Sequence, residues 1–181
     1  YKRQPIIFMG YYNPIYKFGK KKFINKCLEI GVDGLIIVDL PPEEDEEFYI
    51  EAERSKLSVI RLVTPTTDEE RLNKILLTAT GFVYYVSITG ITGTQAPNIA
   101  NVSMNLKKIK TVTDLPVVIG FGIRSSSQAS SMANISDGIV VGSAVVDLIK
   151  SSLDNDDNPT KQTLNSCLDF ISKVSESVKH N

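Results

Sequence analysis

Glycine-marked loops follow three apolar segments of this sequence, and their composition suits the binding of a phosphate group. The loops are Ser87 to Gly93, Gly120 to Gly122, and Gly142 with Ser143. Glycine lets backbone amides approach an oxyanion because no Cβ stands in the way. In barrels of eight strand-helix units, a phosphate frequently lies in the loops after strands seven and eight, against a helix N-terminus. The three loops therefore predict a phosphate site at one end of a parallel barrel.

Each loop also has a purely structural interpretation. Gly120 to Gly122 would serve equally as a tight strand-to-helix turn, with Ser125 to Ser127 capping the next helix. The segment from Ser87 to Thr94 is polar and too short for a helix, so it either folds over a ligand or is a surface loop. The loop of Gly142 and Ser143 repeats the arrangement one unit later and precedes a short helix from Val145 to Ile149, which favours the phosphate interpretation.

Asp39 ends another apolar run and has two possible roles. At the catalytic face of a barrel its carboxylate could act as an acid or a base. It could equally orient loop amides, and we favour that structural role. Tyr84 and Tyr85 point to opposite faces of their strand, so one enters the barrel interior and the other packs under a helix. Periodicity alone leaves open which tyrosine does which.

Composition restricts the classes of partner. The chain has 181 residues, 42% of them hydrophobic, and a net charge of −1. This length fits one domain with a sizeable core better than two domains. The near-zero charge argues against nucleic acid and anionic membranes as partners, and no run approaches the roughly 20 apolar residues that cross a bilayer. A small neutral or anionic ligand fits better.

The sequence offers little for metal binding or thiol chemistry. Cys27 and Cys167 are far apart and lie in amphipathic helical patterns, so we expect two buried, reduced thiols. His180 is the one histidine and lies in a polar terminus. Catalysis by histidine and a metal site are therefore both disfavoured.

Six apolar runs rich in β-branched residues predict strands buried on both faces. They alternate with helical patterns, as βα units with right-handed crossovers do. The predicted fold is therefore α/β, a (βα)8 barrel whose first two units are not in this chain, forming a single incomplete domain over residues 1–181. The six runs are Pro5 to Met9, Leu35 to Val38, Val59 to Val63, Phe82 to Val86, Val117 to Ile119 and Ile139 to Val141.

Several helix boundaries carry local signals. Gly31 is the expected left-handed stop of a helix that buries Phe23, Ile24, Cys27 and Leu28. Thr67 and Glu70 form a capping-box pattern that predicts the start of another helix, with Gly81 as its stop. A weaker signal, Phe48 and Ala52 four residues apart, predicts a helix over 45–57.

The sequence resembles the alpha subunit of tryptophan synthase, from the third barrel strand to the C-terminus. The most specific stretch is YYVSITGITGT at Tyr84 to Thr94. Further support comes from IGFGI at Ile119 to Ile123, VGSA at Val141 to Ala144, PIIFMGYYNP at Pro5 to Pro14 and VDLP at Val38 to Pro41.

The resemblance implies a lyase that cleaves indole-3-glycerol phosphate into indole and glyceraldehyde 3-phosphate. It also implies a beta-subunit partner in an alpha2-beta2 assembly, contacted near Asn13 and Pro14 in the loop after the third strand. Pyridoxal phosphate would belong to that partner, so no cofactor is expected in this chain. The implied substrate-binding residues are Gly93, Gly122, Gly142 and Ser143 for the phosphate with Phe121 beside it, and Tyr11, Tyr84 and Thr92 for the indole side or the closing loop.

The family's catalytic glutamate and aspartate match no carboxylate of this chain, so both are expected upstream of Tyr1. Two alternatives remain: another phosphate-binding barrel, such as phosphoribosylanthranilate isomerase or indole-glycerol-phosphate synthase, and a non-catalytic subunit that docks a partner. The Tyr84 to Thr94 stretch argues against the first alternative. The expected compartment is the cytoplasm, or the plastid stroma if the source is an alga.

Overall fold

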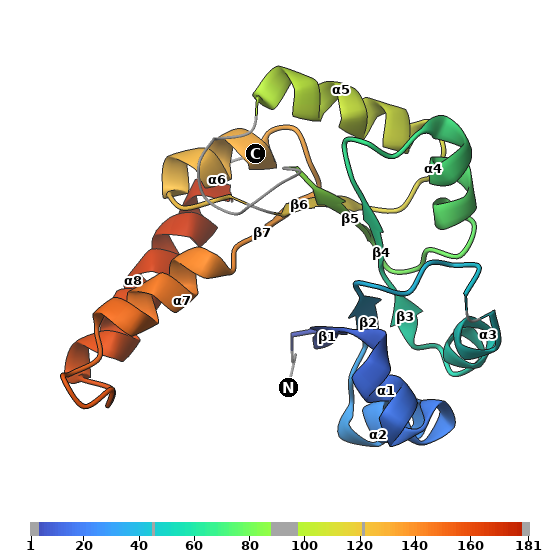
Figure 1. Ribbon diagram of the computed structural model, residues 1–181. Helices are drawn as coiled ribbons and strands as arrows, with labels where there is room; N and C mark the ends of the chain where they lie inside the picture. Colours follow the sequence, from blue (N-terminus) through green and yellow to red (C-terminus); the bar gives the residue numbers. More distant parts are fainter. Residues whose placement is uncertain (1–3, 45, 88–97, 121, 179–181) are drawn as a thin grey trace. The chain divides into compact units, whose positions relative to one another are not determined.

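The structure, a computed structural model, describes residues 4–44, 46–87, 98–120 and 122–178 (Figure 1). The chain divides into two compact units. The first comprises Tyr1–Tyr84 with Ile109–Pro116, and the second comprises Tyr85–Lys108 with Val117–Asn181. The expectation of one barrel domain over residues 1–181 stays a prediction.

The first unit contains a parallel sheet in the order β1-β2-β3. In its register Leu35 pairs with both Phe8 and Val59. The helices of this unit bury apolar side chains in one cluster that includes Ile24 and Phe48. The elements are β1 (Ile7–Gly10), α1 (Tyr12–Phe18), α2 (Lys20–Ile30), β2 (Gly34–Ile37), α3 (Glu46–Arg54) and β3 (Ser58–Val59).

The run from Val59 to Val63, predicted to be one strand, is divided in the structure. β3 ends at Val59 and β4 (Arg61–Val63) belongs to the other sheet, next to β5 (Val83–Val86). The Ile60 amide still donates to the Leu35 carbonyl. The division is defined by the sheet to which each segment is hydrogen-bonded, which the composition of the run does not report. α4 (Glu69–Leu76) lies between β4 and β5 in the chain.

The second unit orders its strands β5-β6-β7, beginning with the last residues of β5. β6 and β7 are parallel, with Gly120 opposite Val140. α8 packs against α6 and α7, and Figure 1 shows α7 and α8 running side by side. The remaining elements are α5 (Ile99–Lys110), β6 (Val117–Gly120), α6 (Ser126–Ala133), β7 (Gly138–Val140), α7 (Ser143–Ser151) and α8 (Lys161–Val178).

The helix ends in the structure can be compared with those predicted from local sequence signals. Gly31 ends α2 with φ of 78°, the left-handed conformation that the sequence predicts. The predicted cap at Thr67 is wrong by one residue, because Asp68 accepts the Arg71 amide instead. Thr67 turns its hydroxyl to the Thr64 amide. Gly81 also is not the stop of α4, which ends at Leu76.

The prediction that the strands are buried on both faces holds for β2 but fails for β1. All four β2 residues are buried, whereas Phe8 and Met9 of β1 are 41% and 58% exposed. β1 is an edge strand of its sheet, with a paired strand on one side only. β7 is half-buried throughout.

The two cysteines differ as well. Cys27 is buried in the core of the first unit, and burial raises the pKa of its thiol. Cys167 is only half-buried on α8, so the prediction of a second buried thiol is wrong. Both thiols are free.

Candidate functional site

The C-terminal ends of β6 and β7 lie next to each other in the second unit. Because Gly120 pairs with Val140, the chain leaves the two parallel strands at the same edge of the sheet. Gly122 and Gly142 each come two residues after that pair. The register thus brings the starts of two predicted phosphate loops together.

The loop after β7 runs directly into the N-terminus of α7. Gly142 occupies the cap position, and no side chain caps this helix. A Cβ at Gly142 would meet no atom of the described residues within 4 Å. Ser143 is the first helical residue, so its amide is one of the unpaired donors of the first turn. An uncapped N-terminus beside open space is suited to an anion.

The loop after β6 has a different character. Gly122 has φ of 81°, a conformation that strongly favours glycine. Ser125 then caps α6 by accepting the Gln128 amide at 3.3 Å, as the sequence predicts. A cavity of about 160 Å³ is lined by Gly122 and by residues of α5 and α6, but not by Gly142 or Ser143. The cavity and the α7 N-terminus are thus separate features.

β5 ends beside β6 in this unit. The amide and the hydroxyl of Ser87 both donate to the Gly120 carbonyl, at 3.1 and 3.0 Å. Tyr85 accepts a hydrogen bond from Asn105 of α5 at 2.9 Å. Tyr85 therefore packs under a helix, and alternation along the strand turns Tyr84 to the opposite face. Both tyrosines are buried, and burial raises the pKa of each phenol.

In the first unit, Asp39 carries out the amide-orienting role. Its Oδ1 accepts the Tyr12 amide at 2.7 Å, at the first residue of α1. Tyr11, the residue before this helix, is 62% exposed. Asn13 and Pro14, expected in a loop, instead lie in the first turn of α1, where proline is tolerated because the helix has no partner for that amide.

Three predicted site residues, Thr92, Gly93 and Phe121, lie outside the described residues. The structure thus brings together the starts of the loops at Gly122 and Gly142, and it places Tyr11, Asn13 and Pro14 in the first unit with Tyr84. His180 also lies outside the described part. Within the described part no group of three His, Cys, Asp or Glu side chains could hold a metal ion.

One charged residue was missed by the sequence reasoning. Arg61 lies in a strand and is only 5% exposed. Its guanidinium lies 3.7 Å above the Tyr49 ring, and its Nε and Nη2 donate to the Thr78 hydroxyl. The sequence did carry a signal for this residue, because an arginine interrupts the otherwise apolar run from Val59 to Val63.

A comparison with protein families matches residues 1–175 to the family described as tryptophan synthase alpha chain. No helix among the described residues is long and apolar enough to cross a membrane.

Solved structures give the same result. The chain is 30% identical to tryptophan synthase subunit alpha from Legionella pneumophila str. Paris, with a TM-score of 0.84 over 98% of this chain and 64% of that one. For tryptophan synthase subunit alpha from Campylobacter jejuni the identity is 32% and the TM-score 0.81, over 96% and 66%. For a chain of the tryptophan synthase complex from Pyrococcus furiosus the identity is 30% and the TM-score 0.77, over 96% of this chain and 66% of that one.

The chain therefore spans about two thirds or slightly less of the length of these structures. The predicted fold class is confirmed: the strands are parallel, and the neighbours are (βα)8 barrels of which this chain covers a part.

Proposed function

Because the chain belongs to the tryptophan synthase alpha chain family, we propose that it contributes the phosphate-binding half of an enzyme that cleaves indole-3-glycerol phosphate. The products would be indole and glyceraldehyde 3-phosphate, formed by a retro-aldol reaction. The observation that carries the proposal is the β6–β7 edge, where two glycine loops start from paired residues and one enters an uncapped helix.

In this proposal the substrate phosphate binds at the N-terminus of α7. The Ser143 amide and hydroxyl donate to its oxygens, and the partial positive charge of the helix N-terminus stabilises the dianion. Gly122 and Gly93 contribute backbone amides from the neighbouring loops, with Phe121 beside them. Tyr11, Tyr84 and Thr92 contact the indole ring or the closing loop.

The bond cleavage itself needs groups that these loops do not supply. The indole ring must be protonated, a glycerol hydroxyl must be deprotonated, and charge on the ring nitrogen must be balanced. We assign those steps to the family's glutamate and aspartate, which match no carboxylate between Tyr1 and Asn181. Asp39 is a poor substitute because its Oδ1 is bound to the Tyr12 amide.

The proposed partner is the beta subunit of tryptophan synthase. Asn13 and Pro14, both exposed in the first turn of α1, are the proposed contact residues. Pyridoxal phosphate would be held by that partner, and the alpha reaction requires no cofactor from this chain.

The test is cleavage of indole-3-glycerol phosphate by the protein expressed together with any native upstream coding sequence. The expected result is release of indole and glyceraldehyde 3-phosphate in equal amounts, with faster turnover when the beta subunit is added. Turnover of a different phosphorylated substrate, such as phosphoribosylanthranilate, would instead support another barrel enzyme. Binding of the beta subunit without turnover would support a docking subunit.

A further inference from the structure

A second cavity lies in the first unit, between the segment after β2 and the helix α4. Its volume is about 250 Å³. The wall combines apolar side chains, including Ile37, Leu40 and Ile75, with two arginines, Arg61 and Arg71. Such a mixture of apolar wall and a few polar groups is typical of small-molecule sites.

Arg61 is the unusual member of this wall because its charge is buried. Tyr49 supports the guanidinium from one face and the Thr78 hydroxyl accepts two of its hydrogen bonds. Among the described residues Arg61 forms no ion pair with a carboxylate. A buried charge is costly unless a counter-charge accompanies it. Burial accordingly lowers the pKa of Arg61.

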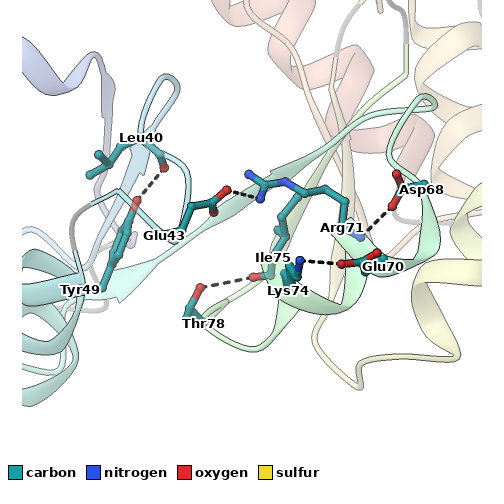
Figure 2. Close-up of polar contacts among 9 residues, drawn as sticks. All are labelled: Leu40, Glu43, Tyr49, Asp68, Glu70, Arg71, Lys74, Ile75 and Thr78. Atoms are coloured by element: carbon teal, nitrogen blue, oxygen red, sulfur yellow. Dashed lines mark hydrogen bonds and ion pairs between the residues drawn. The ribbon is translucent and has the colours of Figure 1, made fainter.

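Its two supporting residues are themselves fixed to the surrounding elements. Tyr49 donates its phenolic hydrogen to the Leu40 carbonyl at 2.6 Å, and the Thr78 hydroxyl donates to the Ile75 carbonyl at 3.4 Å (Figure 2). The guanidinium of Arg61 is therefore held by residues that are tied to two parts of the cavity wall, the segment after β2 and α4. This is the preorganisation that a binding group needs.

The other charges at the cavity already have partners. Figure 2 shows Arg71 reaching from α4 to Glu43. The Nη1 and Oε1 atoms of this ion pair are 2.5 Å apart. Asp39 also lines the cavity, but its Oδ1 accepts the Tyr12 amide. Of the two arginines on the wall, Arg61 is thus the one that forms no ion pair among the described residues.

We propose that this cavity binds a small organic carboxylate, with Arg61 as its charge partner. A guanidinium matches a planar carboxylate through two parallel hydrogen bonds. The apolar wall suits the hydrocarbon part of such a ligand. The carboxylate of Asp39 disfavours a dianion more strongly than a monoanion, so a carboxylate fits better than a phosphate. The site uses residues of the first unit alone and does not depend on the proposed phosphate site.

Benzoate is a suitable probe, and benzamide is its uncharged counterpart. Calorimetry on the protein, expressed with any native upstream coding sequence, is expected to show benzoate binding at least about tenfold tighter than benzamide. The variant Arg61→Gln should lose about tenfold or more of the benzoate affinity. Arg54→Gln, which removes an exposed arginine from α3, is the matched control and should bind benzoate unchanged.

Because Arg61→Gln could fail to fold, the wild-type protein provides a second measurement. In a two-dimensional NMR titration, benzoate should shift the Arg61 Nε–H signal and the amides of Leu40, Leu62 and Ile75. Equal affinities for benzoate and benzamide, no detectable benzoate binding, or shifts confined to other residues would each overturn the proposal. A folded Arg61→Gln variant with unchanged affinity would overturn it as well.

Discussion

A helix follows the end of β1 and the end of β7, and the first amides of these two helices differ in their hydrogen-bond acceptors. Each strand is parallel to its neighbour, ends near a glycine and is followed by a helix whose first amides lack helical partners. After β1, the carboxylate of Asp39 accepts the Tyr12 amide. After β7, no side chain caps α7.

This difference shows where an external anion is useful. At α1 the protein supplies its own negative charge, from a residue 27 positions further along the chain. At α7 no side chain of the described residues accepts these amides, which leaves them to water or to a ligand, and a Cβ at Gly142 would meet no atom of these residues within 4 Å. α4 and α6 resemble α1 in this respect, because Asp68 and Ser125 cap them. α7, which no side chain caps, is the helix that the family resemblance assigns to the phosphate.

The largest expected effect concerns catalysis. The 181-residue chain alone should release no measurable indole from indole-3-glycerol phosphate, since phosphate binding cannot transfer the protons that cleavage needs. The same chain joined to an N-terminal segment that carries the family's glutamate and aspartate should release indole. An indole assay on both proteins side by side provides the measurement. Cleavage by the short chain would show that the catalytic groups are misassigned.

Gly142→Asp is designed to place a carboxylate of the protein itself at the uncapped N-terminus of α7. The new carboxylate would occupy the space beside α7 and repel a bound phosphate, so the affinity for glycerol 3-phosphate should fall at least about tenfold, or about 1.4 kcal/mol. Calorimetry on the intact protein measures this.

Gly10→Asp is the matched control for that variant. Gly10 ends β1, and a Cβ there also meets no atom within 4 Å. Its affinity for glycerol 3-phosphate should equal that of the wild type. If Gly142→Asp also binds like the wild type, Gly142 does not belong to the phosphate site.

Asp39→Ala tests the start of α1 by removing the carboxylate that accepts the Tyr12 amide. The exposed start of α1 would lose its charged acceptor, and the free energy of unfolding should fall by about 1 kcal/mol. Urea denaturation measures the loss, and Asp114→Ala, which removes an exposed carboxylate from the same unit, is the control. Phosphate affinity should not change. An unchanged midpoint would mean that the Asp39 contact does not stabilise the protein.

Ser125→Ala should have the smallest effect. The Ser125 hydroxyl accepts the Gln128 amide at 3.3 Å, a long bond, so its loss should lower the unfolding free energy by about 0.5 kcal/mol. Because α6 is capped by its own serine, glycerol 3-phosphate should bind the variant as it binds the wild type. A clear loss of affinity would mean that the phosphate contacts α6 instead of α7.

The sequence by itself determined several local features of this protein, although its signals for the ends of α4 at Thr67 and Gly81 were wrong. It predicted the left-handed stop at Gly31, a serine cap among Ser125 to Ser127, the alternation of strands and helices, and the family. Each of these depends on residues a few positions apart or on a contiguous motif, so no knowledge of distant contacts was needed.

Other features were decided by the tertiary structure. The sequence left two roles open for Asp39, and only the pairing of β1 with β2 brings its carboxylate to the Tyr12 amide. The division of Val59 to Val63, the exposure of Phe8 and Met9, and the support of Arg61 by Tyr49 and Thr78 likewise depend on segments far apart in the chain. The physical reason is that hydrogen-bond partners and burial are properties of the neighbours in space, which local composition does not specify.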